Sequence, residues 1–161
     1  MLMLVPGYIG QETFLNALFE LDEDQVTDGW WARMVEPLNL KCNLWLCPPE
    51  VTDLKKIPTL IWDKIDVVLF FINLSDHQVL KHLNRFKQII VKISDSKIAP
   101  LPPVIVLGSY QQTSPLAEAQ KRSVLEWSAE QADDWPFLEV DLEATENLPK
   151  IWHQILLHLQ K

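Results

Sequence analysis

LVPGYIGQETFLNAL, residues Leu4 to Leu18, contains the end of an apolar run, a tight turn and the start of an amphipathic helix. The apolar run covers Leu2 to Val5 and stops at Pro6-Gly7, which predicts a short buried strand followed by a turn. Beyond the turn, apolar side chains recur every three or four residues and predict a helix over 11–21: Phe14, Leu15, Leu18 and Leu21. A buried strand leading directly into a helix favours an α/β fold.

The same alternation of apolar runs and helical periods continues to the end of the chain. Further strands are expected over 30–36, 40–47, 67–72, 104–107 and 137–141, and further helices near Pro58, after Ser75 or Asp76, from Ser114-Pro115 to Ala129, and over 148–159. This alternation predicts a mostly parallel sheet with right-handed crossovers and helices on both faces. Only the strands over 30–36 and 40–47 are adjacent in the chain, so they would supply one antiparallel edge.

We therefore expect an α/β fold of one domain spanning residues 1–161. Its architecture would be a three-layer α-β-α sandwich around a six-stranded, mostly parallel sheet. A chain of this length can enclose one substantial core, and its 48% hydrophobic and 22% charged residues are typical of a globular protein.

The charge of the chain restricts its partners. A formal net charge of −8 would repel a phosphate backbone or an anionic lipid surface. The sequence therefore predicts no nucleic acid partner.

The cysteines and the apolar segments indicate the compartment. Cys42 and Cys47 are five residues apart in one expected strand, which places them on opposite faces and predicts that they do not pair. Met1 to Val5 lacks the basic residues of a signal peptide, and the longest clean apolar run, Val67 to Ile72, is too short to span a bilayer. We expect a cytoplasmic protein with no membrane insertion.

The opening stretch resembles the strand, phosphate loop and first helix of the small P-loop GTPases, the Ras-like superfamily. The family pattern is GxxxxGK[ST] followed by a helix that often ends in TLLNAL, and Thr13 to Leu18 reads TFLNAL. Asp66 to Asp76 is similar to the family's fourth strand, and Leu148 to Leu159 is similar to its C-terminal helix. The order of elements matches over essentially the whole chain, so the resemblance implies a small-GTPase-like, P-loop NTPase fold.

The phosphate loop departs from this pattern where the chemistry is done. Aligned on the helix, the family's lysine falls at Gln11 and its magnesium-binding hydroxyl at Glu12. Gln11 cannot neutralise the β- and γ-phosphates, and Glu12 puts a carboxylate at the helix N-terminus that would otherwise receive phosphate. Using Thr13 as the metal ligand, by a shift of one residue, still leaves no lysine. The loop is interpreted as a vestigial nucleotide loop, a degenerate Walker A motif, marked by Gly7, Gly10, Gln11, Glu12 and Thr13.

The other family motifs are missing as well. The DxxG motif that senses the γ-phosphate falls on Leu46 to Pro49, the guanine-reading NKxD on Ser109 to Gln112, and SAK on Asp141 to Glu143. The resemblance therefore implies a pseudo-GTPase: no GTP or GDP binding, no GTP hydrolysis, no catalytic residues and no cofactor. No metal is expected either, because His77 and His82, like His153 and His158, are five residues apart and do not share a helix face.

Two adjacent tryptophans suggest a surface for a partner. Trp30 and Trp31 follow the loop equivalent to the first switch region of the family, and as neighbours in a strand they point to opposite faces. Tryptophan is enriched among binding hot spots, although an edge-strand packing site would use the same residues. The predicted partner-binding residues are Trp30, Trp31 and Arg33.

The favoured function at this point is a catalytically inactive, GTPase-like interaction module. It would act as a scaffold or regulatory subunit and bind a protein partner through the switch-side surface. One alternative is a divergent nucleotide-binding GTPase with atypical ligands. Another is a flavodoxin-like small-molecule or redox domain whose phosphate loop is Pro6 to Thr13. An unrelated α/β domain with a chance Gly-Tyr-Ile-Gly loop also remains open.

Overall fold

The computed structural model describes residues 2–5, 14, 31–35, 42–46, 62–95, 100–110, 112–131 and 135–160. For strands β1 (Leu2–Val5), β2 (Trp31–Val35) and β3 (Cys42–Leu46), the description is of the backbone. The later elements in chain order are β4 (Val67–Asn73), α3 (Val79–Asp95), β5 (Val104–Tyr110), α4 (Pro115–Ala129), β6 (Phe137–Asp141), a 3-10 turn (Thr145–Asn147) and α5 (Leu148–Leu159).

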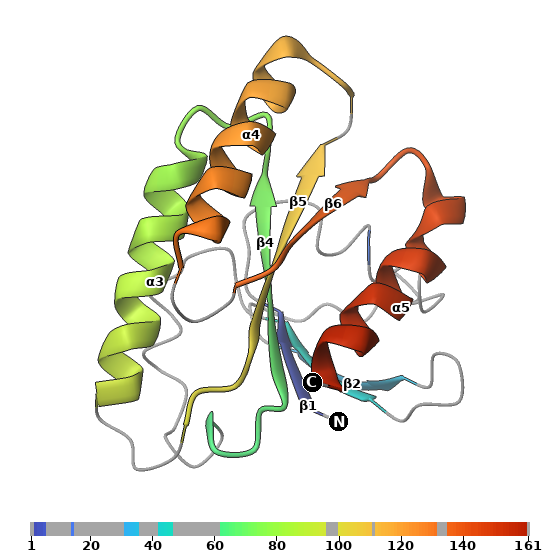
Figure 1. Ribbon diagram of the computed structural model, residues 1–161. Coiled ribbons are helices and arrows are strands. Elements are labelled where there is room, and N and C mark those ends of the chain that lie inside the picture. Colours follow the sequence, from blue (N-terminus) through green and yellow to red (C-terminus); the bar gives the residue numbers. More distant parts are fainter. Residues whose placement is uncertain are drawn as a thin grey trace.

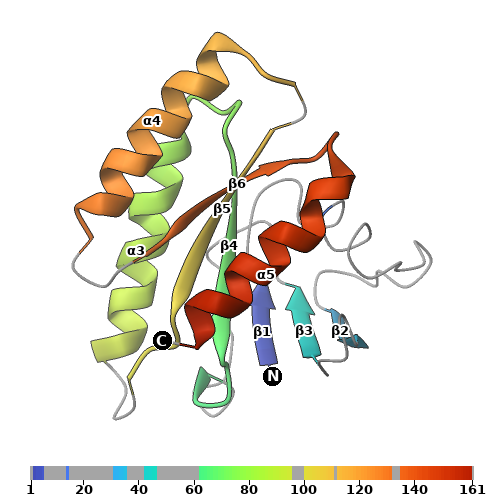
Figure 2. The same ribbon diagram turned by 45° about the vertical axis from the view of Figure 1, so that its right-hand side comes forward.

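The described strands form one sheet in the order β2-β3-β1-β4-β5-β6. Neighbouring strands are parallel except for β2, which runs antiparallel to β3 and lies at one edge. The ends of β4, β5 and β6 point to the same side of the molecule (Figure 1), and Figure 2 shows β1, β3 and β2 continuing the sheet beyond β4. The predicted α/β fold with a parallel sheet is confirmed.

Strand β4 contributes buried side chains to the core on both faces of the sheet. Its residues are buried without interruption from Val67 to Ile72, and successive side chains point to opposite faces. One set packs against α3 and α4, and the other packs toward α5. A strand covered on both faces has no solvent side, which explains why its sequence is continuously apolar.

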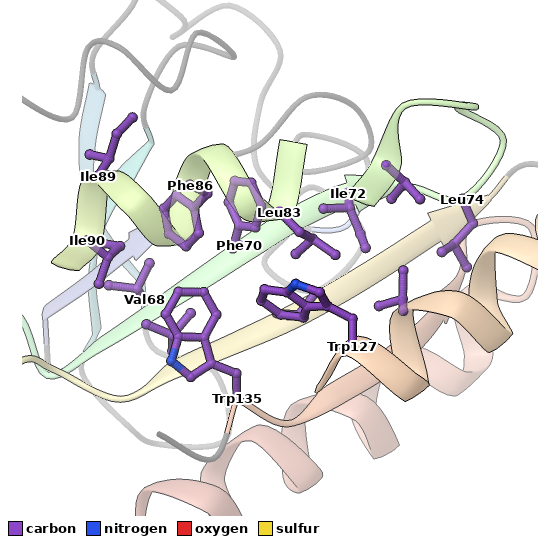
Figure 3. Packing of buried hydrophobic residues seen from close by; sticks show 14 of the residues in the cluster. Val68, Phe70, Ile72, Leu74, Leu83, Phe86, Ile89, Ile90, Trp127 and Trp135 are labelled. Carbon is purple, nitrogen blue, oxygen red and sulfur yellow. The ribbon is translucent and has the colours of Figure 1, made fainter. Parts of the chain in front are cut away.

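The face under α3 and α4 is rich in aromatic rings (Figure 3). The rings of Phe70 and Phe86 stack with their centroids 3.8 Å apart, and Trp135 meets both Phe86 and Trp127 edge to face. Burial of each such side chain stabilises the fold by about 1.5–3 kcal/mol.

The opposite face is covered by α5. Trp152 of α5 is buried there together with Phe71, and Phe14 joins the same cluster with its ring centroid 5.1 Å from that of Phe71. Phe14 has helical backbone conformation, whereas the rest of the helix expected over 11–21 lies outside the described residues. Trp62, Trp127 and Trp152 are all buried.

One strand boundary in the sequence-based prediction is wrong. Strand β5 was expected over 104–107 and continues to Tyr110, because its pairing with β6 extends to Tyr110 opposite Asp141. The apolar pattern ends at Gly108, but a Cβ atom there would lie 2.5 Å from the ring of Phe137. Glycine at this position leaves room for the ring, so it keeps the strand packed rather than ending it.

Candidate functional site

The topology of the sheet places the candidate site at the carboxyl ends of the strands. Strand β3 lies on one side of β1, and β4, β5 and β6 follow one another on its other side, so the order of the strands reverses at β1. In open α/β sheets, ligands bind outside the carboxyl ends of the strands at such a switch point. The segments that follow β1, β4, β5 and β6 therefore define the site.

The segment after β1 includes the residues that the sequence analysis interpreted as a vestigial nucleotide loop. Strand β1 ends at Val5, and the buried ring of Phe14 packs against Phe71 of β4 on the α5 face. Gly7, Gly10, Gln11, Glu12 and Thr13 themselves lie outside the described residues.

The segment after β4 is held by its own polar side chains. Asn73 Oδ1 accepts a hydrogen bond from the backbone N–H of Ser75 at 2.9 Å, and Asp76 Oδ1 accepts one from Gln78 N–H at 2.8 Å. Asp76 Oδ2 lies 3.0 Å from Nε2 of His82, one turn into α3. A carboxylate thus already occupies the N-terminal end of α3, where an anionic ligand would otherwise be favoured.

The end of β5 is where the resemblance to the small GTPases places the guanine-reading motif. Ser109 is buried, and its hydroxyl donates a hydrogen bond of 3.2 Å to the carbonyl oxygen of Ile72 on β4. The N–H of Leu74 in turn donates to the carbonyl oxygen of Ser109 at 2.9 Å. These bonds tie Ser109 into the sheet instead of presenting it to a ligand.

Beside Ser109 lies a side-chain cluster that the sequence did not predict: Tyr110 on β5, Glu139 on β6 and Lys121 on α4. Nζ of Lys121 lies 2.5 Å from Oε2 of Glu139, and the carboxylate of Glu139 also accepts a hydrogen bond from the hydroxyl of Tyr110. Burial, this bond and neighbouring carboxylates raise the pKa of Tyr110 to about 12. The hydrogen bond to Glu139 also raises the pKa of Lys121, against the opposing effect of burial.

The turn after β6 occupies the position of the SAK motif. Asp141 Oδ1 accepts hydrogen bonds from the backbone N–H groups of Glu143 at 2.9 Å and Ala144 at 3.3 Å. The N–H of Leu142 donates to the carbonyl oxygen of Tyr110 at 3.4 Å, which holds the turn to β5. This corner therefore presents carboxylates, and Lys121, its nearby cation, is already paired with Glu139.

The predicted partner surface lies at the opposite edge of the sheet. Trp31 and Arg33 belong to β2, opposite Leu46 and Leu44 of β3 in the antiparallel register. Trp30 lies outside the described residues, as do the residues of the DxxG-equivalent stretch after Leu46. Strand β2 is an edge strand, so one side of its backbone has no neighbouring strand in the described sheet.

The comparisons with known proteins bear on the fold. The chain superposes over 99% of its length on the crystal structure of bacterial selenocysteine-specific elongation factor EF-Sec, with a TM-score of 0.69 and 11% sequence identity. It covers 28% of that chain. No family model matches the sequence, and no curated protein matches it.

The structural likeness supports a P-loop-NTPase-like fold for this chain. At 11% identity it carries no residue-level correspondence. The fold is also widely used, since 761 chains of known structure match this one, and a shared fold does not define an activity.

The described residues show neither a metal-binding cluster nor a helix that could span a membrane. Within them, no three histidine, cysteine, aspartate or glutamate side chains are grouped so that they could hold a metal ion. None of the helices in this part of the chain combines the length and apolarity that a membrane crossing requires.

Proposed function

We propose that this chain is a pseudo-GTPase: a small-GTPase-like domain, with its six-stranded sheet and single antiparallel edge, that binds a protein partner and carries out no catalysis. It would serve as a scaffold or regulatory subunit. The observation that carries the proposal is that polar side chains at the ends of β5 and β6 form hydrogen bonds within the chain. Ser109 is bonded inward to Ile72, and Asp141 caps its own turn. Ser109 and Asp141, the first residues of the stretches that the resemblance aligns with NKxD and SAK, are therefore used by the fold itself.

The electrostatics of the same edge support the proposal. A nucleoside triphosphate with magnesium requires cations and hydroxyl groups around its phosphates. The loop between β1 and Phe14 instead supplies Gln11 and Glu12, and Asp76 already caps α3. Bringing a triphosphate to carboxylates at short range is unfavourable, and more so where water is excluded.

Titration calorimetry with GTP, GDP and ATP in the presence of Mg²⁺ tests this proposal. We expect no binding heat at micromolar concentrations of protein. Saturable binding of GTP or GDP in that range would overturn the proposal and favour a divergent GTPase with atypical ligands. Binding of all three nucleotides would indicate a phosphate site without base selection.

A second experiment addresses the partner surface. We expect Trp30→Ala combined with Trp31→Ala to weaken capture of the native partner at least tenfold, which is the usual scale of an interface hot spot. Leu125→Ala is the matched control, because Leu125 is an exposed apolar residue of α4 near the opposite edge of the sheet. Thermal melting of each variant shows whether the fold is retained. Equal loss of binding in both variants, or loss of folding without selective loss of binding, would contradict this role.

The strand order does not separate the flavodoxin-like alternative from the proposal. The five parallel strands, β3-β1-β4-β5-β6, have the order 2-1-3-4-5 of flavodoxin-like sheets when they are numbered among themselves, and the antiparallel strand β2 is added at the edge. A flavin retained by the purified protein would reveal such a site directly through its visible absorbance.

A further inference from the structure

Helix α3 carries a stripe of long polar side chains on its solvent side. Lys81, Arg85, Gln88 and Lys92 follow one another at intervals of four, three and four residues, so they lie on one helix face. All four residues are exposed, whereas the opposite side of the helix is buried through Val79, Leu83, Phe86, Ile89 and Ile90. We call these four residues the α3 stripe.

The α3 stripe is basic in an acidic protein. Helix α3 contains four lysine and arginine residues and one acidic residue, Asp95, whereas the whole chain has a formal net charge of −8. Within the described residues, neither Arg85 nor Lys92 forms an ion pair. Like charges at positions i and i+4, such as Lys81 and Arg85, slightly destabilise a helix. The charges of Arg85 and Lys92 are therefore available to an acidic group from outside the chain.

The stripe is separate from the helix–helix contact inside the molecule. Helix α3 meets α4 through Asn84, whose Oδ1 accepts a hydrogen bond of 2.9 Å from Nε1 of Trp127. Lys87 also faces α4 and donates to the side chain of Gln131. The stripe residues lie farther round the helix, and all four remain exposed although α3 packs on α4.

An apolar cleft adjoins the carboxyl end of the stripe. It has a volume of about 430 Å³ and lies between the last turns of α3 and the segment before β5. Val91, which precedes Lys92, lines the cleft and is 41% exposed, and Pro103 and the buried Trp135 line it as well. Asp95 is also part of the lining, so the cleft itself does not favour a second anionic group.

We propose that the α3 stripe and this cleft together dock an acidic amphipathic segment of a partner protein, with its carboxylates on the stripe and one apolar side chain in the cleft. The inference rests on the proposed function as an interaction module and names the chemistry of a partner. The distance from Lys81 to Lys92 along the helix axis is about 16 Å, which suits a segment of about three helical turns.

Charge distribution favours a protein segment over a nucleic acid or a membrane. A long polyanion or a charged lipid surface would also meet the acidic remainder of the chain, which repels it. A short acidic segment needs to meet only the stripe. Exposed ion pairs are individually weak. Burial of an apolar side chain in the cleft would therefore slow dissociation of the complex. The charges of the stripe would orient the segment and speed its association.

The test uses a synthetic alanine-based helical peptide of about 16 residues, with glutamate at every fourth position and one terminal leucine. Binding to the full chain is followed by fluorescence anisotropy and by backbone amide shifts in NMR spectra. We expect binding that weakens with added salt and shifts amides of α3. The same peptide with glutamine in place of glutamate is expected to bind at least tenfold more weakly.

Two triple variants decide whether the stripe is responsible. Lys81→Gln, Arg85→Gln and Lys92→Gln together should weaken binding of the glutamate peptide about tenfold. The matched control removes the same charge from exposed sites elsewhere: Lys64→Gln, Arg122→Gln and Lys150→Gln. It should bind like the wild type. Equal weakening in both variants, or no binding by the wild type, would overturn the proposal.

Other occupants give different outcomes under the same conditions. Tighter binding at α3 of a short DNA duplex or of phosphatidylserine vesicles than of the glutamate peptide would overturn the assignment to a protein segment. Self-association that the stripe variant abolishes in sedimentation would replace the partner by a second copy of this chain. Nucleotide binding would refute the pseudo-GTPase proposal without affecting these results. If neither the glutamate peptide nor a nucleotide binds, the docking site is refuted and the pseudo-GTPase proposal is not.

Discussion

Single side chains at the carboxyl end of the sheet are used to hold strands together. Ser109 bonds to β4, and Glu139 links β6 both to Tyr110 on β5 and to Lys121 on α4. Each of these groups faces a partner inside the molecule. These polar side chains therefore serve as part of the structural framework of the sheet.

Tyr110 should titrate above its ordinary pKa of 10.0, because partial burial disfavours the phenolate, and because ionisation would break the hydrogen bond to Glu139 and place a second negative charge beside it. The chain has two tyrosines, so a Tyr8→Phe variant leaves Tyr110 as the sole phenol, and tyrosinate absorbance then gives its pKa directly. We expect a midpoint near the value of about 12. A midpoint at the ordinary value would refute the buried bond to Glu139.

The raised pKa has a consequence for stability. The neutral phenol is favoured in the folded state, so its contribution is complete below the ordinary pKa of 10.0 and is lost as pH rises toward about 12. In Tyr110→Phe the unfolding free energy should therefore depend less steeply on pH in this window. Chemical denaturation at several alkaline pH values measures the difference, with Tyr8→Phe as the matched control.

Gly108→Ala should destabilise the fold by about 1–3 kcal/mol, the usual cost of an overpacked core. The added Cβ would approach Phe137 Cε2 to 2.5 Å and Leu74 Cδ2 to 3.1 Å, so the ring has to move. Urea denaturation measures the loss. Phe137→Leu in the Gly108→Ala background should recover part of it, and a double variant less stable than the sum of the single changes would argue against this clash.

At the scale of elements, polar contacts between residues close in sequence determine where a helix begins, and the sheet determines which face of the helix is buried. Helix α4 begins at Pro115 directly after Ser114, whose Oγ accepts the N–H of Ala117 at 3.1 Å. Helix α3 begins three residues after Asp76, whose carboxylate accepts the N–H of Gln78. The buried faces of both helices then pack on the same side of β4 and β5.

Ser114→Ala should cost about 1 kcal/mol, because it removes the acceptor for one of the unpaired N–H groups of the first turn of α4. Ser114→Asp keeps an acceptor oxygen and should remain close to wild type. Thr113→Ala, at the exposed preceding position, is the matched control. Thermal unfolding compares the three, and a Ser114→Ala variant as stable as the control would refute the capping role.

At the scale of the whole molecule, stability should not depend on a nucleotide. The two faces of the sheet are filled by buried side chains of the chain itself. A ligand that binds the native state at 100 times its Kd would add about 2.7 kcal/mol, enough to raise the Tm of a domain of this size by several degrees. We expect GTP with Mg²⁺ to leave the Tm unchanged in differential scanning fluorimetry, and a rise that saturates with GTP concentration would contradict this.

The most regular elements could be predicted from the sequence with accurate bounds. The prediction of α5 over 148–159 is confirmed, as are α4 from Ser114-Pro115 and β6 over 137–141. In each of these segments, local signals agree with the tertiary environment: an apolar period, a capping residue or a flanking proline. Strand β5 was predicted too short because Gly108 interrupts the apolar pattern, and the ring that fills its place comes from Phe137, in another strand.

The sequence by itself therefore determined the succession of strands and helices, the acidic charge and the presence of Gln11 and Glu12 after the first turn, because period, capping and charge are properties of neighbouring residues. The tertiary structure alone decided that β5 extends to Tyr110 and that Tyr110, Lys121 and Glu139 form one cluster. It also decided that the basic side of α3 faces outward. Those contacts join residues distant in sequence, and they exist only once the strand register and the packing of helices on the sheet bring them together.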